Sequence, residues 1–98
     1  MTPNEKREIM EKALEITGKD FQLMLLVEEC GELLQAIGKV YRNKAGSLEN
    51  LHEEIADVQL MLDQVKLIYD EEKINEIMEQ KLTRLKSRLG EVAQTDTN

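Results

Sequence analysis

Six carboxylates gather in two short windows of this 98-residue chain, EECGE at 28–32 and EEIAD at 53–57. The acids are Glu28, Glu29 and Glu32 in the first window, and Glu53, Glu54 and Asp57 in the second. In each window two of the acids stand three residues apart, so on a helix they share a face. Concentrated negative charge repels itself, and hard divalent cations take oxygen ligands. The pattern therefore points to a cation held between the two windows.

Two long helices joined by a short connector are predicted to carry these windows. Apolar residues recur at steps of three and four along 20–43 and again along 47–69, which is typical of amphipathic helices. The stretch between them, NKAGS at 43–47, has turn chemistry, and Ser47 is predicted to cap the second helix. In an antiparallel hairpin about this connector the two windows are offset by roughly 6 Å, or about one turn.

The apolar faces of these helices place one acid among predicted core residues. The stripe of the first helix is formed by Leu23, Val27, Cys30, Leu34, Ile37 and Tyr41, and that of the second by Leu51, Ile55, Val58, Leu62 and Val65. Cys30 is therefore expected in the core. Glu54 falls inside the apolar arc of the second helix, and Asp57 lies at its edge. Because a buried carboxylate without a partner is costly, a solvated acidic face explains this position poorly.

A shorter helix is predicted before the hairpin and a further helix after it. Residues 2–5 (TPNE) have the pattern of a capping box with proline at the first helical position, and Gly18 ends this helix. The acidic run at 70–72 suits the start of the last helix, which is expected to end near Gly90. The chain is thus predicted to be one all-α domain over 1–98. Its N-terminal helix lies within 1–18, its core spans 20–90, and a tail covers 91–98, the last four residues being disordered.

Composition narrows the functional class. The net charge of −7 argues against a nucleic-acid-binding surface, which is normally basic. The longest apolar run is too short to span a membrane, and the single cysteine suits a reducing, cytoplasmic setting. The apolar arc of the first hairpin helix is wider than one partner helix requires, and the chain is short. We therefore expect a homodimer or homotetramer whose subunits complete the helical bundle.

The paired windows resemble the EExxE…EExxD signature of the MazG-like, all-α nucleoside triphosphate pyrophosphohydrolases, over roughly residues 21–89. The resemblance implies Mg²⁺, with Mn²⁺ as a substitute, bound by Glu29, Glu32, Glu54 and Asp57. It implies hydrolysis of an NTP or dNTP between the α and β phosphates, giving a nucleoside monophosphate and pyrophosphate. Family members also carry phosphate-binding basic residues on a following helix. KLTRLKSRL at 81–89 resembles that feature loosely, which points to Lys81, Arg84 and Arg88, although Leu85 stands where many members have Asn.

The sequence does not decide the roles of two of the acids, and it allows two other functions. Glu28 and Glu53 are candidates for a general base or for groups that orient the metal ligands. A phosphoribosyl-ATP pyrophosphohydrolase-like enzyme has related acidic motifs, but it typically carries Tyr-His where this chain reads DVQLML. The remaining alternative is a non-catalytic helical oligomerisation module whose acids bind no metal.

Overall fold

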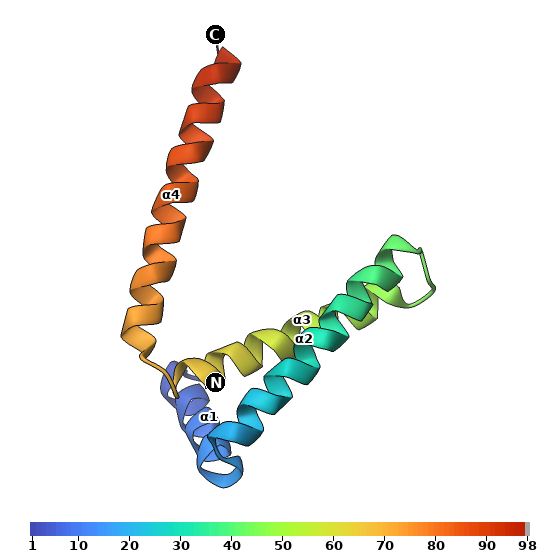
Figure 1. The fold of residues 1–98 in the computed structure, drawn as a ribbon, viewed down its shortest axis with the longest axis vertical. Helices are drawn as coiled ribbons and strands as arrows, with labels where there is room; N and C mark the ends of the chain where they lie inside the picture. Colours follow the sequence, from blue (N-terminus) through green and yellow to red (C-terminus); the bar gives the residue numbers. More distant parts are fainter. Residues whose placement is uncertain (98) are drawn as a thin grey trace.

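The computed structural model describes residues 1–97, with the side chains of 1–91, as four helices joined by short turns (Figure 1). They are α1 (Pro3–Thr17), α2 (Lys19–Tyr41), α3 (Ser47–Lys66) and α4 (Glu71–Thr97). The described residues contain no strand, so the predicted all-α class is confirmed. No helix among them combines the length and apolarity that crossing a bilayer requires. Asn98, at the end of the predicted tail, lies outside the described residues.

Both ends of α1 follow the prediction. The hydroxyl of Thr2 accepts a hydrogen bond from the backbone N–H of Glu5 at 3.1 Å, and Pro3 is the first helical residue. Gly18 ends the helix with its N–H donating to the carbonyl of Leu14 at 2.8 Å. Its φ of 86° and ψ of 162° fall in a region that is essentially open to glycine alone. Gly18 therefore sets the sharp turn from α1 into α2.

Four other boundaries differ from the prediction, and the first is the end of α2, which lies at Tyr41 instead of residue 43. Ser47 is the first residue of α3 rather than its cap, because Gly46 takes the capping position in a left-handed conformation, with φ 73°. α3 ends at Lys66, and Asp70 then caps α4 by accepting a hydrogen bond from the backbone N–H of Lys73 at 3.1 Å. α4 continues to Thr97, because a single glycine such as Gly90 costs a helix only about 1 kcal/mol and does not end it.

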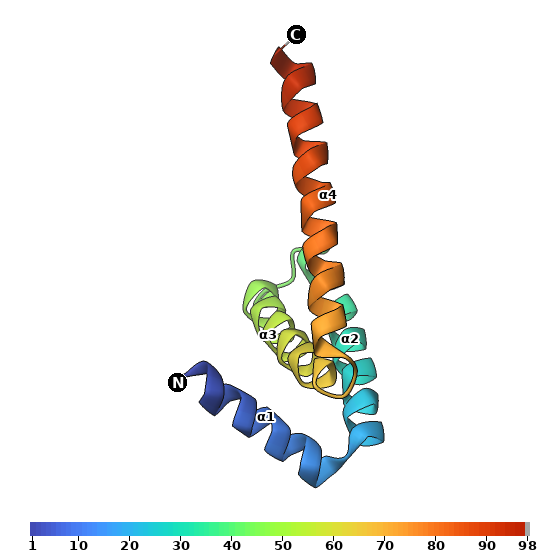
Figure 2. The ribbon, with the colours of Figure 1, turned by 90° about the vertical axis from the view of Figure 1, so that its left-hand side faces the viewer.

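α2 and α3 pack as an antiparallel hairpin, which is the main packing unit of the chain (Figures 1 and 2). Its buried apolar residues are Ala36 of α2 and Val58 and Met61 of α3, with Ala36 fully covered. The polar side chains of Gln22, Ser47, Glu54 and Gln64 are buried as well. The core of the single chain is therefore small, and it contains both apolar and polar side chains.

Of the predicted apolar stripes only Val58 is buried in this core, and most of the other stripe residues are partly or largely exposed, which corrects the prediction. In α2, Val27 is 66%, Leu34 71% and Tyr41 85% exposed, and Cys30 is also exposed instead of lying in the core. In α3, Ile55 and Leu62 are about half exposed. α2 instead turns toward α3 the row that contains Gln22, Glu29 and Ala36, each two turns from the next. A wide apolar arc has two edges, and the hairpin covers only one of them.

α4 leaves the end of α3 and extends away from the hairpin, so the two arms form a V (Figure 1). α1 lies at the base of the V and packs against α2 and α3. The molecule is correspondingly extended, measuring 58 × 40 × 26 Å.

Candidate metal centre

Three carboxylates from the two helices of the hairpin converge at one place. Glu29 of α2 and Glu54 and Asp57 of α3 each have an oxygen that lies within 4.8 Å of the other two. We call these three residues the acid cluster. Interhelical packing thus closes the offset of about one turn that the connector suggested, and it unites the two sequence windows.

Two oxygens of the acid cluster are buried without a partner. Glu54 is only 9% exposed, which confirms the core position predicted for it from the sequence. Among the described residues, neither Oε2 of Glu54 nor Oε2 of Glu29 has a hydrogen-bond donor. A buried carboxylate oxygen without a donor or a positive charge is unfavourable. These two oxygens therefore have unused capacity to bind a cation.

The charges around the acid cluster are negative, and they act on both glutamates. Burial raises the pKa of Glu54, and the negative charges of Glu32 and Asp57 raise it further. Burial also raises the pKa of Glu29, followed by the charges of Glu32, Asp57 and Glu54. Each of these neighbouring charges is negative, and each therefore favours either protonation of the cluster or occupation by a cation.

Glu32, the fourth ligand implied by the family resemblance, lies beside the acid cluster. It is exposed, and its negative charge raises the pKa of both Glu29 and Glu54. Its oxygens are not among those that converge within 4.8 Å. The two candidate bases are exposed, and of these Glu53 acts on Glu54 through its charge. The structure thus brings five of the six window acids into one electrostatic group.

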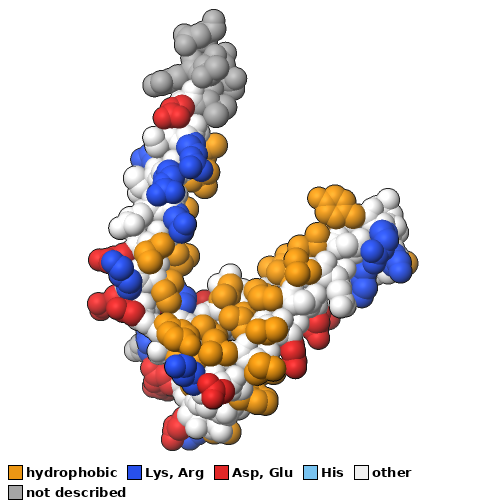
Figure 3. Space-filling model, viewed as in Figure 1, with side chains coloured by type: hydrophobic (Ala, Val, Ile, Leu, Met, Phe, Trp, Pro, Cys, Tyr) orange, Lys and Arg blue, Asp and Glu red, His pale blue; other side chains and the backbone are white. Residues whose placement is uncertain are grey.

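The basic residues that the resemblance implies for phosphate binding lie elsewhere. Lys81, Arg84 and Arg88 are exposed on α4, which leads away from the hairpin (Figure 1). Within the single chain the structure does not bring them to the acid cluster. Figure 3 shows acidic side chains on the outer side of the hairpin, whereas hydrophobic side chains line its inner side, toward α4.

Gln22 of α2 is a further buried polar residue, and the sequence patterns did not point to it. It is 3% exposed, its amide donates to the Thr17 hydroxyl at 2.7 Å, and its Oε1 lacks a partner among the described residues. Its spacing of seven residues from Glu29 was the available signal, because it puts both side chains on the row that faces α3. Gln22 lies two helical turns before Glu29, near the start of α2. Its hydrogen bond to Thr17 joins α2 to the end of α1, so it is not part of the acid cluster.

The donor set suits a hard divalent cation. Three carboxylates offer only anionic oxygen, which Mg²⁺, Mn²⁺ and Ca²⁺ prefer over nitrogen or sulfur sites. Mg²⁺ usually takes one or two protein carboxylates and fills its remaining positions with water and phosphate oxygens. Asp57 is exposed, so solvent reaches one side of the acid cluster. The acid cluster is thus suited to hold a cation that a phosphate compound can share.

Comparison of the chain with models of protein families, with curated proteins and with solved structures finds no match. The case for a metal centre therefore rests on the convergence of the acids and on the chemistry of their oxygens.

Proposed function

We propose that this protein is a Mg²⁺-dependent nucleotide pyrophosphohydrolase, which cleaves an NTP or dNTP between the α and β phosphates. The observation that carries the proposal is the acid cluster with its two buried, partnerless oxygens. Like charges that are partly buried destabilise a folded chain unless a cation balances them. Ligand binding therefore explains this cluster better than a structural role does. The paired EECGE and EEIAD windows, with their resemblance to the MazG-like enzymes, support the nucleotide substrate.

In this proposal the chain supplies the ligands of the cation and a general base for the attacking water. Glu29, Glu54 and Asp57 bind the ion, and Glu32 stands beside them as a further ligand. A bound divalent cation neutralises phosphate charge and lowers the pKa of a coordinated water. Glu53 is the better placed candidate base, because it is exposed and close enough to influence Glu54. Its carboxylate accepts the proton of a water that attacks phosphorus, while Glu28 remains the second candidate.

Phosphate binding by α4 requires a larger assembly in this proposal. Because α4 leads away from the acid cluster, Lys81, Arg84 and Arg88 reach a bound triphosphate only across two or more copies of the chain. A homodimer or homotetramer, like a cytoplasmic location, stays a prediction from the sequence.

Pyrophosphate release from a panel of NTPs and dNTPs with Mg²⁺ tests the proposal. The parent protein is expected to act on at least one of them, and Glu54→Gln should reduce the rate by orders of magnitude. Glu15→Gln is the matched control, because it makes the same chemical change at an exposed site on α1. Absence of pyrophosphate from every nucleotide, at protein concentrations where Mg²⁺ binds, would overturn the enzymatic assignment.

A second candidate function is a non-catalytic helical assembly module, which the exposed apolar stripes favour. This candidate predicts that the acids bind no metal. Titration of the protein with Mg²⁺, followed by thermal melting, separates the two. A melting temperature that does not respond to Mg²⁺ would favour the assembly module.

A further inference from the structure

The inner faces of the V are apolar on both arms (Figure 3). On α4 the exposed apolar residues are Ile77, Met78, Leu82, Leu85 and Leu89. On the hairpin they are Val27, Leu34, Ile37 and Tyr41 of α2 and Leu48, Ile55 and Leu62 of α3. At about 100° per residue, the α2 and α3 rows of an antiparallel pair lie on one common face. That face is turned toward α4, because Leu62 and Gln59 line a hollow together with Ile74 and Met78.

The chain exposes far more surface than its mass requires. Its accessible surface is 7944 Å² for 11.3 kDa, whereas a compact monomer of that mass exposes about 5,700 Å². The radius of gyration is 17.7 Å, against about 13 Å for a compact chain of this length. The excess area of roughly 2,200 Å² exceeds the ~800 Å² that each partner contributes to a standard interface. It is in the range that subunits of obligate dimers bury.

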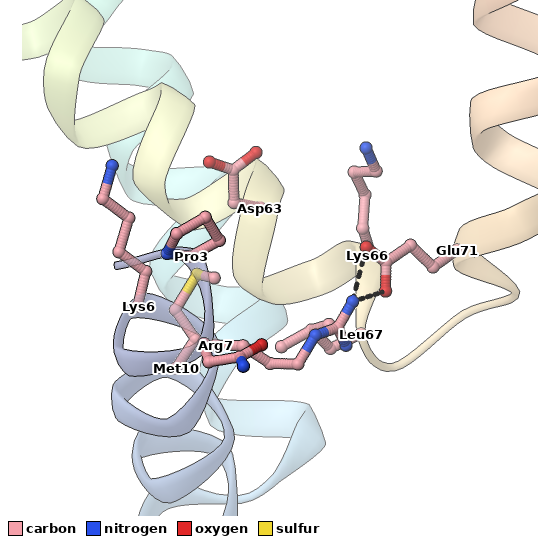
Figure 4. A pocket seen from close by; sticks show the side chains of 9 residues that line it. Pro3, Lys6, Arg7, Met10, Asp63, Lys66, Leu67 and Glu71 are labelled. Atoms are coloured by element: carbon pink, nitrogen blue, oxygen red, sulfur yellow. Dashed lines mark hydrogen bonds and ion pairs between the residues drawn. The ribbon is translucent and has the colours of Figure 1, made fainter. Parts of the chain in front are cut away.

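Two side-chain contacts lie at the elbow between α3 and α4. The guanidinium of Arg7 donates to both carboxylate oxygens of Glu71, at 3.1 and 2.9 Å, and so ties α1 to the first turn of α4 (Figure 4). Lys66, in the last turn of α3, donates to the side-chain oxygen of Asn75 at 2.6 Å. Each exposed contact is weak, but closing α4 onto its own hairpin would break them together. A partner from outside therefore fits the open V better.

We propose that a second copy of this chain fills the V, with α4 of each copy lying along the apolar face of its partner's hairpin. The lengths agree, because the 27 residues of α4 span about 40 Å and the 23 residues of α2 about 35 Å. Met78, Leu82, Leu85 and Leu89 recur at steps of four and three, and such a stripe packs into the groove between two helices. The exchange is reciprocal, so the interface closes at two copies. It rests on the fold alone and is independent of the proposed hydrolysis.

Sedimentation equilibrium at micromolar protein is the first test. The parent is expected to be a dimer, and Leu85→Glu should weaken dimerisation roughly 100-fold or more, because each dimer carries the buried charge twice. Ser87→Glu is the matched control, since it introduces the same charge on the opposite face of α4. A compact, stable parent monomer would overturn the proposal. So would a Leu85→Glu variant that dimerises as tightly as the parent.

Disulfide trapping tests the exchange itself and does not depend on a disruptive variant. Cys30 is the only cysteine of the chain and is exposed on α2. The parent is mixed with Cys30→Ala chains that carry Leu82→Cys, Leu85→Cys or Leu89→Cys, and the mixture is oxidised mildly. Reciprocal exchange predicts a disulfide that joins the two different chains. A parent dimer linked through Cys30 alone would instead indicate contact between hairpins, and would overturn the exchange.

Closure of α4 within one chain is the remaining outcome of that experiment. A chain that keeps Cys30 and carries Leu85→Cys is expected to form disulfides between chains. A disulfide within a single chain, in a protein that sediments as a monomer, would show that α4 covers its own hairpin and would refute the second copy as occupant.

Discussion

Substitution of Glu54 by glutamine separates a metal ligand from a structural residue. Glu54 is 9% exposed, its Oε2 has no donor among the described residues, and burial with the charges of Glu32 and Asp57 raises its pKa. Glutamine nearly keeps the shape of the side chain and removes a charge that its neighbours repel. Without metal, the Glu54→Gln variant should therefore melt at the same temperature as the parent, or higher.

The two proteins should differ in their response to Mg²⁺. A ligand that binds only the folded state, at 100 times its dissociation constant, stabilises the parent by about 2.7 kcal/mol. For a domain of this size that raises the melting temperature by roughly 10–20 °C. If loss of one ligand weakens binding about 100-fold, the same Mg²⁺ concentration raises the melting temperature of the variant by only about 2–3 °C.

Thermal melts with and without Mg²⁺, at one fixed protein concentration, test whether Glu54 is a metal ligand. Glu15→Gln should respond to Mg²⁺ like the parent, because its side chain is exposed on α1. Strong destabilisation of metal-free Glu54→Gln would show that the carboxylate has a satisfied structural partner. Equal stabilisation of parent and Glu54→Gln by Mg²⁺ would remove Glu54 from the ligand set and refute the acid cluster as a metal centre.

Three further predictions address the pH dependence, the core and the basic helix. The raised pKa values of Glu29 and Glu54 mean that the folded, metal-free chain binds more protons than the unfolded chain just above the ordinary glutamate range. Their contribution to stability therefore falls as the pH rises through that window and returns as the pH falls toward 5. Urea unfolding between pH 5 and 8 should show this, with a smaller change in Glu54→Gln, and an equal change in both would contradict it. Ala36→Leu should cost about 1–3 kcal/mol of unfolding free energy by overpacking the α2–α3 contact. Ala56→Leu, at an exposed site, should cost little, and similar urea midpoints for the two would argue against the hairpin packing. Lys81→Ala and Arg84→Ala should raise the KM for a triphosphate without changing the melting temperature, since both cations bind phosphate by charge-assisted hydrogen bonds. Unchanged steady-state kinetics in both variants would leave these side chains as solvated helix cations.

Local chemistry made much of this fold predictable. The Thr2 cap and the Gly18 terminus depend on residues close in sequence, and the structure confirms both. The connector predicted at 43–47 is also present, and it spans 42–46 in the structure. The core position of Glu54 followed from the periodicity of α3, because a carboxylate among apolar residues at helical spacing is conspicuous. The end of α4 could not be predicted in the same way, since a lone glycine at position 90 weakens a helix without ending it.

The sequence by itself determined the helices, the connector and the presence of two acidic windows on a shared hairpin. Only the tertiary structure decided which edge of each apolar arc faces the neighbouring helix. Periodicity shows that a helix has an apolar side, but a wide arc offers several packing directions of similar hydrophobicity. In the folded chain, α2 packs on α3 through the row that contains Glu29 and Ala36, whereas Cys30 and Leu34 are exposed. The same choice of packing direction drew Glu29 to Glu54 and Asp57, because side chains from different helices meet only where backbones approach each other.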